Sequence, residues 1–470
     1  MNLELNGTNV IDESQRRGKA SSLFWPWCGA NVSLLALSYG SFFLGFGISF
    51  WQATLAALLG TVLSFLLVGF SSLAGKKSNA PTMVLSRASF GIKGSLIPGL
   101  LSYMVFVGWE IVLMSLGTLA TGTVFIRLGN LDQNTAMAIG FAIAVALTVT
   151  SGVLGFAVIM RIQRVLTVVT IVMTCFYIGL TVNEIDWSVV TSLPSGNLQG
   201  FIGAIIFGAT GIGLGWVNAA ADYSRYLPRT TSSKAVVGWT VFGASIVPII
   251  LVTYGAALSA SNEKLSEGIA SDPIGALTTI LPSWYLVIFA LVAIFGLVGG
   301  AILNLYSSGL ALISIGVPVK RHVAASFDAL LMFLGVIYFV WVADDFFFPF
   351  QGFLLTLGVP IAVWSAIFVT DVFLRKSYSE SDLFSERGRY GRWNFQAISI
   401  MALGTFVGWG FVTNSFASWL SWQGYFLFLI GGKDGQWAYA NLGVFFALLI
   451  GFFGYLILAR KKIMLQQSID

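Results

Sequence analysis

Two neighbouring residues deep in an apolar stretch of the sequence could take part in binding chemistry. Trp109 lies roughly ten residues into the segment 95–126, too deep for the tryptophan belt of a membrane interface. Glu110 follows it, and a carboxyl group well inside an apolar segment is a functional hypothesis by default. We interpret Glu110 as a candidate proton carrier. The alternatives are helix packing for Trp109 and a structural hydrogen bond for Glu110.

Two other apolar segments contain helix-breaking residues. Segment 24–50 has a proline, a glycine and an asparagine near its start, and segment 199–221 has alternating glycines near its middle. Unpaired backbone groups are tolerated at membrane depth only where they line a cavity. Interrupted helices at corresponding positions of two halves point to the binding site of a transporter. The alternative is that the glycines only allow close helix packing. The candidate binding groups at these breaks are Asn31, Ser33, and the backbone of Gly211 and Gly213.

The composition requires a membrane setting for these residues. Of the 470 residues, 57% are hydrophobic and 10% are charged, with a mean hydropathy of +0.85. Soluble domains carry about 25% charged residues, so a water-soluble enzyme is excluded. The two cysteines, Cys28 and Cys175, indicate no disulfide framework, and the single histidine, His322, excludes a histidine-rich metal site. No HExxH or GxSxG motif is present, so we expect no catalytic residues and no metal.

Twelve apolar segments of membrane-spanning length predict an all-α integral membrane protein. Only Arg127, Lys264 and Lys433 of the 25 basic residues fall in loops assigned to the outside, which places both termini in the cytoplasm. Residues 416–430 are interpreted as an outer interfacial segment. We expect a cytoplasmic tail at 1–23, a transporter domain at 24–460 and a cytoplasmic tail at 461–470. The predicted spans are 24–50, 52–75, 95–126, 134–158, 164–183, 199–221, 235–258, 284–315, 325–343, 351–374, 395–416 and 439–459.

Several motifs resemble those of the nucleobase:cation symporter-1 family. Ser86–Pro98, with Phe90-Gly91-Ile92-Lys93-Gly94-Ser95, is similar to the loop before helix three of that family. Gly215–Arg229 resembles the end of helix six in its purine–cytosine permease branch. Asn304-Leu305-Tyr306-Ser307 resembles a helix-eight motif, and Thr370–Lys376 followed by Gly388-Arg389-Tyr390 resembles the end of helix ten. The motifs occur in order along the chain.

The resemblance implies a leucine-transporter-like fold of two inverted five-helix repeats, about 24–183 and 199–374, followed by two helices at about 395–459. It also implies substrate contacts. Trp109 and Trp216 would stack on a flat ring, and Asn304 would bind the edge of that ring. Leu113 replaces an amide that the family often has, which favours a less polar ring edge. Gly299 and Gly300 replace the hydroxyl pair of sodium-coupled relatives, so a proton is favoured over sodium as the coupling ion.

The sequence therefore predicts a secondary symporter in the cell membrane. It would import cytosine, a purine or a similar small heterocycle by alternating access, driven by a cation gradient. Allantoin, hydantoin or thiamine-type pyrimidine import, sodium coupling, and a channel or facilitator remain alternatives. The expected partners are the heterocycle and the lipid bilayer. We expect no cofactor, no nucleic acid and no obligatory protein partner.

Overall fold

The computed structural model describes residues 7–129, 131–152, 156–317, 321–343, 345–415 and 418–468. Within these ranges every regular element is a helix or a helical turn. The elements of the first part are α1 (Phe24–Asn31), α2 (Leu35–Leu44), α3 (Phe50–Ser78), α4 (Thr82–Phe90), α5 (Leu96–Gly129), α6 (Gln133–Gly152), α7 (Phe156–Thr181) and α8 (Trp187–Ser192). They continue with α9 (Leu198–Gly208), α10 (Ala220–Ser224), α11 (Ser233–Ser261), α12 (Glu263–Ser271), α13 (Leu286–Ser314), α14 (Arg321–Ile337), α15 (Phe347–Leu374), α16 (Phe395–Gly410) and α17 (Gly443–Gln467).

Eight helices in the described ranges are long and apolar enough to cross a membrane, and the bent pair formed by α1 and α2 adds a ninth candidate span. Three shorter apolar helices, Gln133–Ala146, Phe327–Val342 and Phe395–Gly410, lie where the sequence predicts further spans. The all-helical membrane class is confirmed. The count of twelve spans and the five-plus-five repeat remain predictions. The predicted interfacial segment contains the 3-10 turns η10 (Ser418–Leu420) and η11 (Leu427–Ile430), with residues 416 and 417 outside the described ranges.

The interruption predicted in the first segment is confirmed. Helix α1 ends at Asn31, α2 begins at Leu35, and the two axes differ by 66°. Asn31 lies in the last turn of α1, and its side-chain amide donates to the carbonyl of Trp27 at 2.8 Å. The bend leaves the backbone of residues 32–34 outside any helix, so this stretch can present polar groups to a cavity.

The second predicted interruption is also confirmed. Helix α9 passes into a π-helical turn, η4 (Ala209–Gly213), then a 3-10 turn, η5 (Leu214–Ala219), before α10 begins. Single π turns inside helices frequently mark functional sites. The alternating glycines lie in η4 and at the start of η5, since residues without Cβ tolerate these departures from α geometry.

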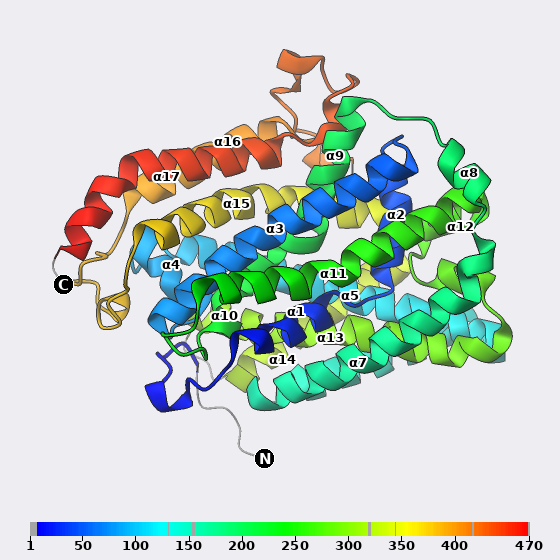
Figure 1. Cartoon of the computed structure of the whole chain (residues 1–470), viewed down its shortest axis with the longest axis horizontal. Helices are drawn as coiled ribbons and strands as arrows, with labels where there is room; N and C mark the ends of the chain where they lie inside the picture. Colours follow the sequence, from blue (N-terminus) through cyan, green and yellow to red (C-terminus); the bar gives the residue numbers. More distant parts are fainter. Residues whose placement is uncertain are drawn as a thin grey trace.

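The broken helices lie inside a bundle that has two distinct ends (Figure 1). The 3-10 turn η1 (Glu13–Gln15), α10 and the end of α17 lie at one end, whereas α8, α12 and the residues 418–440 lie at the other. Helix α13 crosses the interior, packed against α5, α7 and α1. Its side chains from Val298 to Ala311 are all buried, so it forms the centre of the core.

Candidate functional site

A small internal cavity lies where both helix breaks meet α5 and α13. Its volume is about 60 Å³. Ligand pockets usually measure about 300–1,000 Å³, so the walls of this cavity are closed down and must part to admit a ligand. The lining residues are Ala30, Asn31, Ser33, Leu35, Ala36, Tyr39, Trp109, Leu113, Gly211, Ile212, Trp216, Pro248 and Asn304.

The two candidate tryptophans form aromatic walls of this cavity. Trp109 of α5 packs edge-on against Phe350 of α15, with ring centroids 5.6 Å apart. Trp216 of η5 packs edge-on against Trp27 of α1 at 5.9 Å. A Cβ atom on Gly215 would lie only 3.0 Å from the indole nitrogen of Trp109, so this glycine allows the close approach of η5 to α5. Both indoles are thus held by packing and supply flat faces for a ring.

The polar groups of the cavity come from α1, the bend that follows it, α2, η4 and α13. Asn304 of α13 is buried, and its side-chain amide donates to the carbonyl of Gly300 at 3.0 Å. Ser33 accepts a hydrogen bond from the Leu35 amide at 3.3 Å. Tyr39 of α2 donates its hydroxyl hydrogen to the Gly211 carbonyl at 2.8 Å, which joins the two broken helices. The cavity therefore combines aromatic faces with a few fixed polar groups.

Leu113, Gly213 and Glu110 are placed differently with respect to the cavity. Leu113 lines it, so the position where the family often has an amide is apolar here. Gly213 instead packs against α3, where a Cβ atom would overlap the side chain of Ser64. Glu110 is fully buried on another side of α5 and is not among the lining residues.

The glycine pair on α13 faces α1. A Cβ atom on Gly299 would lie 3.0 Å from the Gly29 carbonyl oxygen, and one on Gly300 would lie 3.5 Å from that of Ala30. The side-chain amide of Gln163, on α7, donates to the Gly299 carbonyl at 2.6 Å. The carbonyls of α1 therefore meet glycines where sodium-coupled relatives are expected to have hydroxyl groups.

Buried polar contacts close the bundle on the side of α10. The amide of Thr82 donates to the Asp222 carboxylate at 2.8 Å, and Arg225 donates to the Tyr306 hydroxyl at 2.9 Å. At the end of α15, Arg375 donates to Asp371 at 2.8 Å and both side chains are buried. The contacts of Thr82 with Asp222 and of Arg225 with Tyr306 join α4, α10 and α13.

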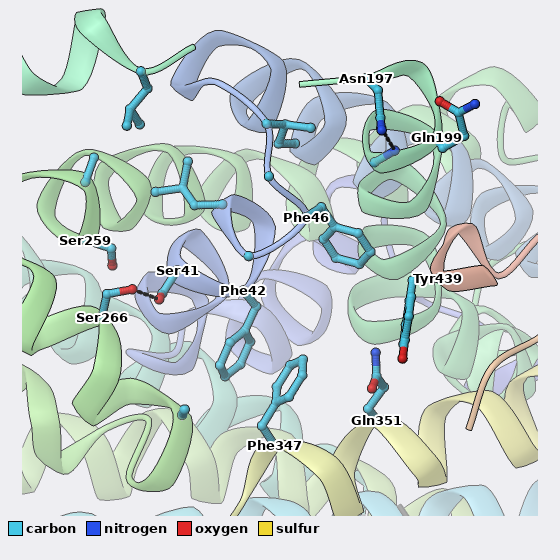
Figure 2. Close-up of a pocket in the computed structure, with 18 of the residues that line it drawn as sticks. Ser41, Phe42, Phe46, Asn197, Gln199, Ser259, Ser266, Phe347, Gln351 and Tyr439 are labelled. Carbon is cyan, nitrogen blue, oxygen red and sulfur yellow. Dashed lines mark hydrogen bonds between the residues drawn. The ribbon is translucent and has the colours of Figure 1, made fainter. Parts of the chain in front are cut away.

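A larger vestibule of about 900 Å³ opens at the other end of the bundle, between α2, α9, α12 and α15 (Figure 2). Figure 2 shows the rings of Phe42 and Phe347 next to each other, and their centroids are 4.8 Å apart. Phe42 also packs against Tyr39, which lines the small cavity. The vestibule is the larger space, but the helix breaks and convergent polar groups mark the small cavity as the candidate binding site. The aromatic residues separate the two.

Comparisons with known proteins agree with this arrangement. The family model described as permeases for cytosine and purines, uracil, thiamine and allantoin matches residues 10–433. A putative purine-cytosine permease of Bacillus subtilis, YxlA, is 24% identical over 451 residues and 93% of both chains. The cytosine permease of Escherichia coli K12 is 41% identical over 66 residues, 14% of this chain and 16% of that protein.

The fold matches that of Mhp1, a nucleobase-cation-symport-1 family transporter whose structure holds bromovinylhydantoin in a closed conformation. The TM-score is 0.73 at 18% identity, with all of both chains covered. The inward-facing structure of Mhp1 gives a TM-score of 0.70, covering 100% of this chain and 96% of that one. The chain is thus a membrane transporter and not an enzyme. It belongs to the nucleobase:cation symporter-1 family and is similar to the purine–cytosine permeases.

Some lining residues carried no signal in the sequence. Tyr39 follows the predicted break in segment 24–50 and Pro248 lies in segment 235–258, and an aromatic residue or a proline is common in any membrane helix. Asp328 does not line the cavity, but it carried no signal in the sequence either, because it lies close to the start of segment 325–343 and resembles a charge at a helix end. Only its burial beside α5 distinguishes it, as described below.

Proposed function

We propose that this transporter is a symporter that imports cytosine, a purine or a similar small heterocycle by alternating access, using a proton gradient. The observation that carries the proposal is the cavity at the two helix breaks, which combines Trp109, Trp216 and Asn304. Aromatic faces bind a flat ring, and an amide matches a ring edge that both donates and accepts. The family description and the purine–cytosine relatives support this substrate class.

A second substrate class, allantoin, hydantoins or thiamine-type pyrimidines, is favoured by one observation. Leu113 lines the cavity and offers no hydrogen bond, so one side of the ligand is met by an apolar group. A screen of ligand-induced thermal stabilisation with cytosine, purines, allantoin, hydantoins and thiamine would separate the two classes. Stabilisation by cytosine or a purine alone supports the first, and stabilisation by the others alone supports the second.

Proton coupling is supported by the glycines at positions 299 and 300 and by the buried Glu110. In proteoliposomes, uptake should follow an imposed pH gradient and ignore the replacement of sodium by choline. Accumulation driven by sodium without a pH gradient would refute this coupling. It would mean that other oxygen ligands, such as the α1 carbonyls, bind the ion. We place the protein in the cell membrane with both termini in the cytoplasm.

Trp109→Ala should reduce uptake to background while leaving expression normal. The variant removes one stacking face, and stacking of a base on an aromatic side chain contributes about 1–3 kcal/mol. Trp284→Ala is a suitable control, because this tryptophan is 65% exposed on the surface of the bundle. Uptake kinetics of Trp109→Ala equal to the parent would remove Trp109 from the binding site.

A further inference from the structure

Two buried carboxyl groups from different helices meet beside the candidate binding cavity. Glu110 of α5 and Asp328 of α14 are both fully buried. Tyr103 lies seven residues before Glu110 on the same face of α5 and is hydrogen-bonded to Asp328, which places the two carboxyl groups near each other. Among the described side chains, no arginine, lysine or histidine pairs with either group. Two unneutralised carboxylates in a membrane interior are expensive, so this pair must hold a proton.

The hydrogen bonds around the pair are unequal. Tyr103 of α5 donates its hydroxyl hydrogen to one oxygen of Asp328, and Ser308 of α13 donates to the other at 2.8 Å. The Ser308 hydroxyl also lies near Glu110, but it donates to Asp328, and both oxygens of Glu110 are left without a hydrogen bond among the described residues. An ionised carboxylate only accepts hydrogen bonds, which is what the surroundings of Asp328 provide. Glu110, without donors, is suited to the neutral acid.

Helices α5 and α13 connect the carboxyl pair to the cavity. Glu110 directly follows Trp109 on α5, so the two side chains leave the helix about 100° apart. Ser308 lies one helical turn beyond Asn304 on α13, on the same face of that helix. A movement of α5 relative to α14 that accompanies ligand binding would change the distance between Glu110 and Asp328, and a movement of α13 would change the hydrogen bond from Ser308 to Asp328.

We propose that Glu110 and Asp328 form one proton-binding site, in which Glu110 carries the transported proton and Asp328 supplies the fixed negative charge that holds it. The proton enters from outside, binds one oxygen of Glu110, and leaves to the cytoplasm after the bundle opens inward. No other bond changes. The inference rests on the proposed proton coupling. It goes further by assigning the site to a pair of residues on two helices.

A pH effect on transport could also come from other titratable groups on the helices packed around the pair, so the test needs a control. Among the titratable side chains that the structure describes, Tyr103 contacts the pair through Asp328, and α6 carries no charged residue. His322 is the single histidine of the chain and lies in the first turn of α14, six residues before Asp328. His322→Gln is therefore the matched control. The remaining groups on these elements are Tyr306 (α13), Arg321 (α14), Tyr338 (the π turn η8, Tyr338–Val342), Arg87 (α4), Arg127 (α5) and Asp371 (α15).

The test measures cytosine-driven proton entry into proteoliposomes with a trapped pH dye, together with cytosine affinity across pH. If cytosine does not bind, the probe is the ligand that stabilises the parent in the thermal screen. In the parent protein, affinity should weaken as pH rises and Glu110 loses its proton. Glu110→Gln and Asp328→Asn should each abolish proton entry and flatten the pH profile, while affinity at low pH stays within about threefold of the parent. His322→Gln should behave as the parent.

The results distinguish three cases: a proton site formed by both residues, a proton site formed by Glu110 alone, and transport without proton coupling. Proton entry that survives in Asp328→Asn but is lost in Glu110→Gln overturns the pair and leaves proton coupling intact. Proton entry that survives in both variants also overturns the pair and leaves proton coupling intact. No proton entry in the parent, with sodium-driven uptake, overturns both proposals. If Asp328→Asn does not fold, Tyr103→Phe and Ser308→Ala replace it. Each removes one hydrogen bond to Asp328 and should shift the pH profile, and an unchanged profile in both overturns the pair.

Discussion

The side chain of Asn304 is the polar group best placed to read the edge of a ring. It is 2% exposed, lines the cavity and is oriented by its hydrogen bond to Gly300. Asn304→Ala should weaken ligand binding by roughly 1–3 kcal/mol, because a buried polar group of the ligand loses its partner. Isothermal titration of the purified variant measures this. Asn304→Leu should bind no better. A variant isotherm that overlays the parent would assign Asn304 to contacts between helices.

At the level of residues, spacing and motif context predicted part of the cavity and missed the rest. Trp109 could be predicted because it is too deep for an interfacial belt, and Asn304 because the motif Asn304-Leu305-Tyr306-Ser307 resembles one of the family. Tyr39 lines the same cavity, but its hydroxyl has a role only because the bend after α1 brings it to Gly211. Gly213 was expected at the binding site, and its contact with α3 depends on the exact rotation of the π turn.

Among the elements, α2 and α11 pack with their backbones in contact, which depends on Gly40 of α2 and Gly255 of α11. A Cβ atom on Gly255 would overlap the carbonyl of Leu37, a backbone atom that cannot move independently. Gly255→Ala should therefore destabilise the protein by about 1–3 kcal/mol and lower uptake. Gly238→Ala, on the same helix with open space around it, is the control. Equal thermal unfolding of the two variants would contradict this packing argument.

The N-terminal segment before α1 is held to the bundle by Glu13. The Glu13 carboxylate accepts hydrogen bonds from Asn79 at 3.1 Å, Arg16 at 2.9 Å and Arg229 at 2.9 Å. The hydrogen bond from Asn79, followed by the arginine contacts, lowers the pKa of Glu13 below its usual 4.5. A lowered folded-state pKa stabilises the docked segment above pH 4.5, and this contribution is lost as pH falls through the lowered pKa.

Glu13→Gln should consequently loosen the segment at neutral pH. The Gly18 amide, which donates to the Tyr226 carbonyl at 3.2 Å, should exchange its hydrogen a few times faster in the variant. The effect is small because exposed ion pairs contribute up to about 1 kcal/mol. Corrected for intrinsic exchange, the difference should vanish at a pH below the lowered pKa of Glu13. A difference that persists there would show that the charge of Glu13 is not what holds the segment.

Helix boundaries show why some elements could be predicted and others not. The breaks in the first and sixth segments were found because proline, glycine and asparagine disfavour α geometry. The actual bend lies at residues 32–34, slightly beyond the predicted residues, since Asn31 still completes the last turn of α1. Helix α12 and the following 3-10 turn η6 (Gly275–Ile280) fill the stretch between the seventh and eighth segments, which hydropathy alone could not assign.

For the molecule as a whole, the two ends of the bundle differ in both charge and access. The vestibule of about 900 Å³ lies at the end that the basic residues assign to the outside. The opposite end is covered by the contacts of Asp222 with Thr82, of Arg225 with Tyr306, and by the N-terminal segment. In the orientation that the basic residues predict, this arrangement corresponds to a carrier with its outer entrance open down to the aromatic residues and its inner exit closed.

Cysteine labelling in whole cells tests both the orientation and the access. Starting from Cys28→Ala/Cys175→Ala, a thiol at position 351 should react with a membrane-impermeant reagent added outside, because Gln351 lines the vestibule. The adduct should block uptake by filling the entrance. Ser381→Cys, exposed in the loop after α15, should react only in inside-out vesicles. Outside labelling of Ser381→Cys would invert the topology. A Gln351→Cys variant that reacts from neither side would show that the vestibule is closed in the resting protein, so that substrate enters only after α2 and α15 separate.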